Sequence, residues 1–244
     1  MNTSDFYTSL MRADFADQPV QVFDGVEFDE KTFLELLESS NDWKIVSSSD
    51  GPVSHVFEDP MGDAMDHSHT SNYFGLHTDG QYLDEVPPIC LLYCADAGSG
   101  GTPTVFGDSR ILIKTLEEKG MLELAKEFDF IYTKKEGKEF RRPLIEANPA
   151  NGELVMCVAT HSPPIRLVPK EGSTKSQQEA EAFFDELSDL AESTLELSVH
   201  EWKTGQVVAF DNVSLIHGRG LAEQKDQQVS DVDRHLVRIW LARK

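Results

Sequence analysis

The sequence predicts an α+β protein that is mainly β and is built on a β-sandwich or barrel. Two observations predict this class: β-rich runs bounded by turn residues recur along the chain, and helical periodicity is confined to a few segments. The length of 244 residues suits one domain of this kind, so we expect residues 1–244 to form a single domain. The predicted strands lie at 43–48, 89–94, 153–160, 195–202, 206–211 and 235–242.

Three segments have the periodicity of helices. At 29–39, Asp29 can cap a helix that carries an apolar stripe. At 176–192, apolar residues recur at helical spacing with acidic residues on the opposite face. A helical pair is expected over 109–127, interrupted at Gly120.

Turn residues predict how some of the strands are connected. The runs 195–202 and 206–211 are expected to form a hairpin in which Gly205 supplies a positive φ. The chain is then expected to turn at Asp211 and Asn212 and to return as another strand. Loop chemistry without periodicity, typical of lids and binding loops, marks two stretches, 58–72 and 162–176.

Composition excludes several classes of function. A net charge of −21 repels phosphate backbones and anionic lipid, which argues against nucleic-acid and membrane-surface partners. No stretch approaches the roughly 18 apolar residues of a membrane span, and the N-terminus lacks the pattern of a secretory signal. Three cysteines without metal-type spacing argue against a disulfide framework or a zinc knuckle. We expect Cys90 and Cys94 to be buried thiols and the protein to be cytoplasmic.

A histidine and an aspartate form the first part of a candidate metal site. His77 and Asp79 are two residues apart, and on a strand both side chains would point to one face and could bind one ion. His217 is the best candidate for a third ligand, because it ends an apolar strand at a glycine turn. Two histidines and one carboxylate leave the opposite face of an ion open, which suits Fe(II) in oxygen-activating enzymes.

The H-x-D pattern by itself is more often a surface pair than a set of ligands. A rival set, Asp66, His67 and His69, lies in a loop of small and polar residues and is interpreted as solvent-exposed. The residues before His77, YFGL, are aromatic and apolar, as a protected metal site requires. The surroundings therefore favour His77 over the rival set.

The C-terminal run RHLVRIWLAR predicts a site for a carboxylate ligand. Arg234 and Arg238 are four residues apart and would share one face of a strand. Arginine binds carboxylates through a bidentate fork, so this pair suits a dicarboxylate. Arg243 is interpreted as part of a charged edge. The Gly-rich stretch at 98–108 lacks the spacing and the lysine of a P-loop, but its Thr104 could donate a hydrogen bond to the same carboxylate, unless its role is structural.

The order of these motifs resembles one enzyme family. H-T-D, then G-G-T-P-T-V-F-G-D, then W-x-x-G-x-x-x-x-x-D-N-x-x-x-x-H-G-R, then R-H-L-V-R-I-W-L is similar to the taurine dioxygenase and clavaminate synthase-like family of Fe(II)/2-oxoglutarate-dependent oxygenases. The motifs extend over most of the chain. The resemblance implies a double-stranded β-helix, or jelly-roll, core with flanking helices.

Carried over by position, the resemblance assigns a role to each motif residue. It implies that the iron ligands are His77, Asp79 and His217. It implies that the distal carboxylate of 2-oxoglutarate is held by Arg234 and Thr104. It places Arg238 near the 2-oxoglutarate head or an anionic substrate group, and Arg219 against the substrate or the turn.

The sequence departs from the family pattern in three places. Arg234 lies farther beyond His217 than is usual, with a polar insertion between them. The Gly-rich turn has Thr-Pro where an acid more often precedes the threonine, which makes Thr102 a rival to Thr104. The chain is also short for the family, which predicts a reduced substrate lid.

The expected activity is oxidation of a small molecule with Fe(II), 2-oxoglutarate and O₂. We expect hydroxylation of an unactivated C–H in an amino acid, organic acid or natural-product precursor, with release of succinate and CO₂. The carboxylate of Asp79 argues against halogenation, because related halogenases have a small residue there. The alternatives are a desaturase, a ring-forming oxidase, a silent jelly-roll binding protein, or a metal-dependent isomerase or hydrolase. Candidate substrate residues are Tyr73, Phe74, Tyr82, Arg219 and Trp240.

Overall fold

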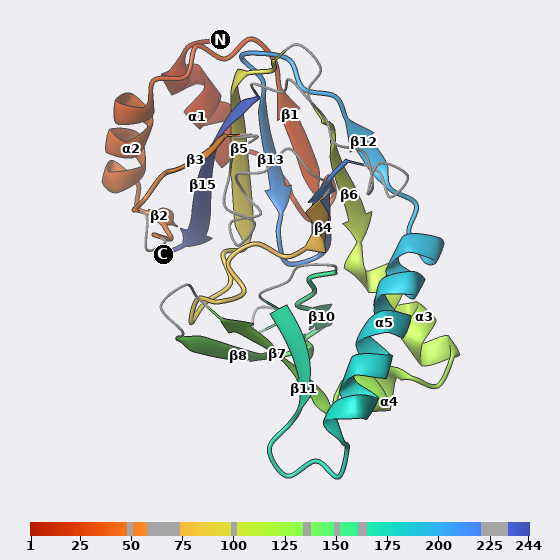
Figure 1. The fold of residues 1–244 in the computed structure, drawn as a ribbon. Coiled ribbons are helices and arrows are strands. Elements are labelled where there is room, and N and C mark those ends of the chain that lie inside the picture. The colour runs from red at the N-terminus through yellow and green to blue at the C-terminus, as the bar shows by residue number, and fades with distance from the viewer. Residues whose placement is uncertain are drawn as a thin grey trace.

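Two antiparallel sheets form the centre of the protein (Figure 1). The computed structural model describes residues 1–47, 51–57, 74–98, 102–133, 138–148, 152–160, 165–220 and 234–244. The first sheet has the order β1-β13-β5-β15-β2, and β3 also pairs with β15. Its strands are β1 (Val20–Phe23), β2 (Trp43–Ile45), β3 (Ser54–Phe57), β5 (Ile89–Asp96), β13 (Val207–Asp211) and β15 (His235–Arg243). The second sheet, in the order β12-β6-β14-β4, consists of β4 (Phe74–His77), β6 (Thr104–Asp108), β12 (Ser198–His200) and β14 (Leu215–Arg219).

The three central strands of the six-stranded sheet are buried on both faces. This is why β5, β13 and β15 read in the sequence as continuous apolar runs rather than as alternating ones. Their inward side chains, such as Cys90, Phe210 and Trp240, pack with Phe106 and Leu215 of the four-stranded sheet. The two sheets thus enclose one core, and the predicted mainly β architecture is confirmed.

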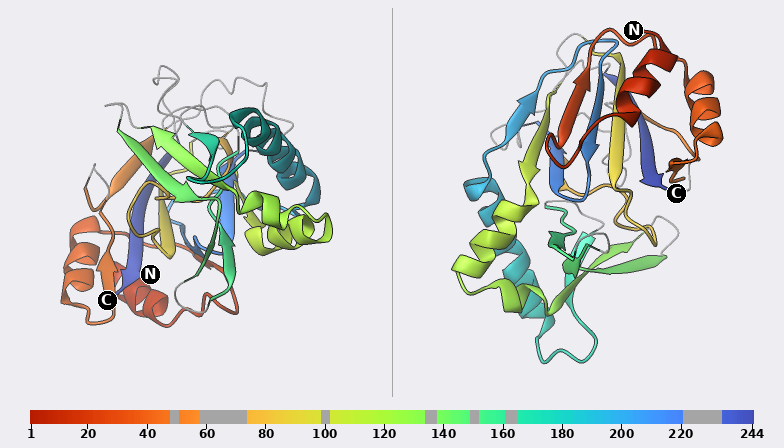
Figure 2. Two further views of the ribbon diagram at one scale, coloured as in Figure 1. Left: turned by 90° about the horizontal axis from the view of Figure 1, so that it is seen from below. Right: turned by 180° about the vertical axis from the view of Figure 1, so that it is seen from behind.

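Two N-terminal helices cover the outer face of the six-stranded sheet (Figure 2). Helix α2 (Glu30–Ser39) is the helix predicted at 29–39, and the Asp29 carboxylate accepts a hydrogen bond from the Thr32 amide at 2.7 Å. Helix α1 (Thr3–Met11) was not predicted; the side chain of Asn2 caps it. Both helices pack on the outward side chains of β5, β13 and β15.

A second layer of helices and small sheets lies below the sandwich in Figure 1. Helix α5 (Gln177–Thr194) begins at a capping box of Ser176 and Glu179, and the predicted pair over 109–127 is divided at Gly120, whose φ is 70°. The pair consists of α3 (Ser109–Glu118) and α4 (Leu122–Ala125). The small strands are β7 (Phe128–Thr133), β8 (Glu139–Pro143), β9 (Ile145–Ala147), β10 (Leu154–Met156) and β11 (Ile165–Pro169).

The predicted hairpin between 195–202 and 206–211 is wrong. Strand β12 pairs with β6 in the four-stranded sheet, whereas β13 pairs with β1 and β5 in the six-stranded sheet. Gly205 does have the expected positive φ of 83°, but its turn carries the chain from one sheet to the other. Turn chemistry alone does not distinguish a hairpin from such a crossing, because both need the same backbone conformation.

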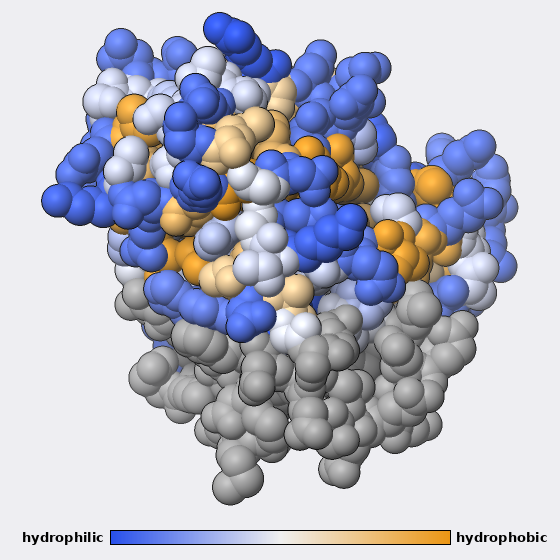
Figure 3. Space-filling model, turned by 90° about the horizontal axis from the view of Figure 1, so that it is seen from above, coloured by the Kyte–Doolittle hydropathy of each residue, from blue (hydrophilic) through white to orange (hydrophobic). Residues whose placement is uncertain are grey.

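The described part of one outer face is mostly hydrophilic. Figure 3 shows small apolar patches between polar side chains on that face. Among the described residues, no helix is long and apolar enough to cross a membrane. The three cysteines are buried free thiols, as predicted for Cys90 and Cys94.

Candidate active site

Three predicted metal ligands lie together on or just beyond two neighbouring strands of the four-stranded sheet. His77 is the last residue of β4, and His217 lies opposite it on the neighbouring strand β14. Asp79 Oδ1 is 3.6 Å from His77 Nε2, and Asp79 Oδ2 is 3.9 Å from His217 Nε2. Their ligand atoms all lie within 4.8 Å of one another, and all three residues are buried. Two ligands of one first-row metal ion, each bound at about 2.1 Å, lie roughly 3–4 Å apart, so this donor set fits one ion.

Hydrogen bonding and burial orient the two imidazoles. The Nδ1 atom of His77 lies 2.9 Å from the Gly75 carbonyl, which can only accept, so Nδ1 carries a proton and Nε2 is the ring nitrogen that faces Asp79. Burial lowers the pKa of His217 to about 3, so its ring is neutral at neutral pH. Among the described residues, His217 Nδ1 has no hydrogen-bond partner.

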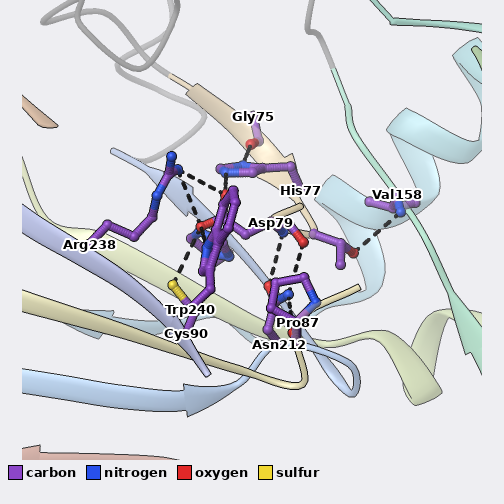
Figure 4. Close-up of polar contacts among 11 residues, drawn as sticks. Gly75, His77, Asp79, Pro87, Cys90, Val158, Asn212, Arg238 and Trp240 are labelled. Atoms are coloured by element: carbon purple, nitrogen blue, oxygen red, sulfur yellow. Dashed lines mark hydrogen bonds and ion pairs between the residues drawn. The ribbon is translucent and has the colours of Figure 1, made fainter. Parts of the chain in front are cut away.

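The main chain of Asp79 is fixed by one buried amide (Figure 4). Strand β4 ends at His77, so the strand alternation that we expected to align the two ligands does not reach Asp79. Instead, Asn212 Oδ1 accepts from the Asp79 amide at 2.9 Å, and Asn212 Nδ2 donates to the Asp79 carbonyl at 2.9 Å. The same Nδ2 donates to the Pro87 carbonyl at 2.8 Å. Asn212 had been interpreted only as a turn residue.

The carboxylate of Asp79 is surrounded by donors from the six-stranded sheet. Trp240 Nε1 donates to Oδ2 at 3.0 Å, Cys90 Sγ donates to it at 3.4 Å, and Arg238 Nη1 lies 3.3 Å from Oδ1 (Figure 4). Burial opposes ionisation, but the charge of Arg238 beside the carboxylate outweighs it, so the pKa of Asp79 lies well below its ordinary value. The carboxylate is therefore ionised and ready to bind a cation.

Two glycines allow the ligand strands to lie close to their neighbours. A Cβ on Gly75 would be 2.1 Å from the Thr160 carbonyl oxygen, and a Cβ on Gly218 would be 2.8 Å from the Phe74 carbonyl oxygen. Neither has a positive φ; Gly218 lies within β14, not at the turn that we expected after His217. Gly220, with a φ of 78°, has the turn conformation. Gly75 and Gly218 are therefore required for close packing beside the candidate metal ligands.

A partly open cavity lies beside the three ligands. The cavity is lined by the three candidate ligands, three arginines, Thr104, Gly218 and an apolar wall. The arginines are Arg219, Arg234 and Arg238, and the wall consists of Val56, Phe74, Leu92 and Leu236. Arginines facing a buried metal site suit anionic ligands that bind between them and the ion.

Thr104 and Thr102 are the two candidates for a hydroxyl that contacts the cosubstrate beside Arg234. Thr104 lines the cavity, and its Oγ1 accepts a hydrogen bond from Trp202 Nε1 at 2.9 Å. Thr102 does not line the cavity, and its main-chain carbonyl accepts a hydrogen bond from Arg234 Nη1. The geometry therefore favours Thr104 as a cosubstrate contact.

The candidate substrate residues are divided by the structure. Phe74 and Arg219 line the cavity. Tyr82 and Trp240 are not part of the lining; Tyr82 stacks on Tyr132, and the indole of Trp240 points to the Asp79 carboxylate. Tyr73 lies outside the described residues, as do Asp66, His67 and His69.

Several contacts of the site were not predicted. Cys90 and Asn212 hold Asp79, and Trp202 contacts Thr104. Cys90 lies in an apolar run that gives no sign of a metal site nearby. Asn212 and Trp202 belong to the motif that carried the family resemblance, so their presence was visible although their contacts were not.

Comparisons with known proteins agree with this geometry. The profile of the family described as "Taurine catabolism dioxygenase TauD, TfdA family" matches residues 4–240. The tyrosine isonitrile desaturase of Pseudomonas aeruginosa is 27% identical over 195 residues, which are 73% of this chain and 62% of that protein. This chain therefore spans less than two thirds of that relative's length. The 3-((Z)-2-isocyanoethenyl)-1H-indole synthase of Fischerella ambigua is 25% identical over 197 residues, which are 73% of this chain and 69% of that protein.

Solved structures have the same fold. PvcB, described as an Fe, alpha-ketoglutarate dependent oxygenase from an isonitrile synthetic pathway, matches with a TM-score of 0.68 and 20% identity over 98% of this chain and 81% of that one. A taurine dioxygenase from Burkholderia xenovorans matches with a TM-score of 0.65 and 16% identity over 98% of this chain and 80% of that one. At these identities the likeness establishes the fold, and the predicted double-stranded β-helix core is confirmed.

Proposed function

Since the chain belongs to the taurine catabolism dioxygenase TauD, TfdA family, we propose that it is an Fe(II)- and 2-oxoglutarate-dependent oxygenase that oxidises a small organic molecule. The observation that carries this proposal is the convergence of His77, Asp79 and His217 beside a cavity lined by arginines. An isomerase or hydrolase on a similar barrel would need the metal ligands but not the arginines.

The three ligands would hold Fe(II) on one face and leave the opposite face toward the cavity. Two imidazoles and one carboxylate are the donor set of non-haem Fe(II) oxygenases. Asp79 also argues against halogenation, because its carboxylate occupies the position where halide would bind. The hydrogen bond from His77 Nδ1 to Gly75, and those from Asn212 to Asp79, fix these donors before an ion arrives.

The cavity would hold 2-oxoglutarate between the ion and Arg234. In this proposal Arg234 and the hydroxyl of Thr104 bind its distal carboxylate, and its keto-acid end lies toward the three ligands. Arg234 is only 3% exposed, so its ion pair with a carboxylate would be little screened by solvent. Arg238 lies next to Asp79 and would face the keto-acid end or an anionic group of the substrate.

When bound, Fe(II) with 2-oxoglutarate and O₂ supplies the oxidising chemistry, with release of succinate and CO₂. The residues of this chain bind and orient the reactants and exclude water. The apolar wall, which includes Phe74, Leu92 and Leu236, would position a C–H of the substrate, and Arg219 would bind an anionic group. We therefore expect an amino acid, an organic acid or a natural-product precursor with a carboxylate.

Hydroxylation is the first candidate outcome and desaturation the second. Desaturation is favoured by one specific observation: the tyrosine isonitrile desaturases of Pseudomonas aeruginosa and Erwinia amylovora are among the relatives, at 27% and 26% identity. Both outcomes begin with hydrogen removal from a positioned C–H. Mass analysis of the product distinguishes them, because hydroxylation adds one oxygen atom and desaturation removes two hydrogen atoms.

We also propose that residues 1–244 form one oxygenase domain. In support, β1 from the N-terminal part and β15 from the C-terminal part belong to the same six-stranded sheet. The strands β4 and β14, which would carry the histidine ligands, are likewise neighbours in one sheet although they are far apart in the sequence.

Succinate release tests the proposed activity. Protein reconstituted with Fe(II) and supplied with 2-oxoglutarate and O₂ should release succinate and CO₂, and candidate amino acids and organic acids should increase the rate. His217→Ala should abolish turnover while leaving the fold intact, and His55→Ala, at an exposed histidine outside the site, is the matched control. A wild-type protein that binds neither Fe(II) nor 2-oxoglutarate would refute the proposal. Binding of both without succinate, with every candidate substrate, would indicate a silent binding protein instead.

A further inference from the structure

One buried tryptophan determines the direction of a hydroxyl in the cavity. Trp202 follows β12 and is 8% exposed, and its Nε1 lies 2.9 Å from Thr104 Oγ1. An indole N–H can only donate, so in this hydrogen bond the hydroxyl oxygen of Thr104 must be the acceptor. In a contact between two hydroxyls either group can donate, whereas here only the indole N–H can donate.

The hydroxyl hydrogen of Thr104 is not used in this hydrogen bond and can be donated to a different acceptor. Within the part of the chain that the structure describes, no hydrogen bond donated by this hydroxyl is formed. Thr104 is 4% exposed and lines the cavity beside Arg234. A hydroxyl that already accepts from an indole is thus a donor facing an anion site, and a carboxylate can only accept.

The packing of Trp202 keeps this arrangement in place. Strand register puts His200 opposite Thr104, and the ring of His200 contacts the indole edge to face with centroids 4.6 Å apart. The indole also belongs to the core between the two sheets, together with Phe106. It therefore has little freedom to turn its N–H away from Thr104.

We propose that Trp202 is a positioning residue for the cosubstrate: its indole N–H holds Thr104 as a hydrogen-bond donor to the distal carboxylate of 2-oxoglutarate. The inference rests on the proposed function, because it needs that dicarboxylate in the cavity. Trp202 N–H, Thr104 O–H and the carboxylate then form a chain in which each hydrogen bond polarises the next. Arg234 supplies the charge, and the chain supplies direction and selectivity for the distal carboxylate.

Binding of two ligands tests the inference. Protein loaded with Mn(II) without O₂ is titrated calorimetrically with 2-oxoglutarate and with 2-oxopentanoate, which has the same chain length but lacks the distal carboxylate. Trp202→Phe keeps an aromatic ring and removes the N–H, and it should weaken 2-oxoglutarate binding about three- to ten-fold. It should leave binding of 2-oxopentanoate unchanged. In steady-state turnover the same variant should raise KM for 2-oxoglutarate and leave kcat unchanged.

Three further variants complete the cycle. Thr104→Val should weaken 2-oxoglutarate binding by itself, and adding Trp202→Phe to it should have no further effect, since the two residues act through one hydroxyl. Thr104→Ser retains the hydroxyl and should bind 2-oxoglutarate nearly as the wild type does. Trp43→Phe, at a buried tryptophan on the other side of the six-stranded sheet, is the matched control and should bind both ligands normally.

The outcomes separate this inference from the proposed function. If the wild type does not bind 2-oxoglutarate, both are overturned. If the wild type binds it and Trp202→Phe binds it equally well, the inference alone is overturned. The same conclusion follows if Trp202→Phe weakens both ligands to the same extent, or if its effect persists in the Thr104→Val background.

Discussion

Replacement of Asn212 by Ala should destabilise the protein more than any substitution of an exposed polar residue. Asn212 is fully buried, and its amide forms three hydrogen bonds to the main chain of Asp79 and Pro87. Alanine leaves one N–H and two carbonyls without these partners. Each buried polar group without a partner costs about 1–3 kcal/mol, so after partial relief by water we expect a loss of about 3–6 kcal/mol. Because small proteins are stable by only about 5–15 kcal/mol, this loss is easily measured.

Urea denaturation of the metal-free protein measures the free energy of unfolding directly. Asn41→Ala, at an exposed asparagine, is the control and should change it by less than about 0.5 kcal/mol. Asn212→Asp should not rescue the loss, since a carboxylate would face the carbonyls of Asp79 and Pro87. In protein that is still folded, Asn212→Ala should also bind Mn(II) more weakly, because the main chain of Asp79 is no longer fixed. A loss below about 1 kcal/mol would refute the claim that this amide holds the site together.

Three further predictions concern residues around the site. Gly75→Ala should lower the melting temperature and weaken Mn(II) binding, because the added Cβ would lie 2.1 Å from the Thr160 carbonyl oxygen. A normal Mn(II) affinity would show that β4 can shift without cost. Trp240→Phe removes a donor to the buried carboxylate of Asp79 and should lower the free energy of unfolding, measured by urea denaturation, by about 1.5–3 kcal/mol. An unchanged free energy of unfolding would mean that another donor replaces the indole. Burial, and then the charge of the neighbouring Glu146, raises the pKa of Cys157 from 9.0 to about 12. A raised thiol pKa adds stability that is complete below pH 9 and is lost as pH rises toward 12, by about 1.4 kcal/mol per pH unit, and Cys157→Ala should remove this part of the decline. Equal slopes in the two proteins between pH 9 and 10.5 would contradict that assignment.

The parts of the fold that were predictable are those specified by local signals. The Asp29 cap and the capping box at Ser176 determine where two helices begin, and both helices follow from short-range spacing. Strands β5, β13 and β15 were visible because burial on both faces makes them continuously apolar. The short strand β4, which carries His77, has only four residues and no alternation to identify it.

The pairing of strands could not be predicted from the same signals. Lys203, Thr204 and Gly205 form a turn that would suit a hairpin, yet the chain crosses from one sheet to the other there. Which sheet a strand joins depends on contacts such as β12 with β6, far apart in the sequence. A rule that uses only the residues of the turn does not include the free energy of these distant contacts, so it cannot predict the pairing.

The candidate ligands were found by their residue types and order, but one physical reason for their alignment was wrong. We expected strand alternation to bring His77 and Asp79 to one face, whereas β4 ends at His77 and the Asn212 amide holds Asp79. Trp240 was similarly interpreted as a possible substrate contact from its aromatic character. Its partner is the carboxylate of Asp79, and only the three-dimensional structure brings the two together.

The position of the candidate site between the two sheets would couple metal binding to packing of the sandwich. The candidate ligands His77 and His217 come from the four-stranded sheet, whereas Trp240 and Cys90, which contact the Asp79 carboxylate, come from the six-stranded sheet. The complete set of contacts therefore exists only when the sheets are packed together. An ion that binds the folded protein and not the unfolded chain raises the free energy of unfolding. When the ion is in large excess over its dissociation constant, this increase is proportional to the logarithm of the ratio of the two concentrations. A change in the core between the sheets should for the same reason weaken metal binding, even where it touches no ligand.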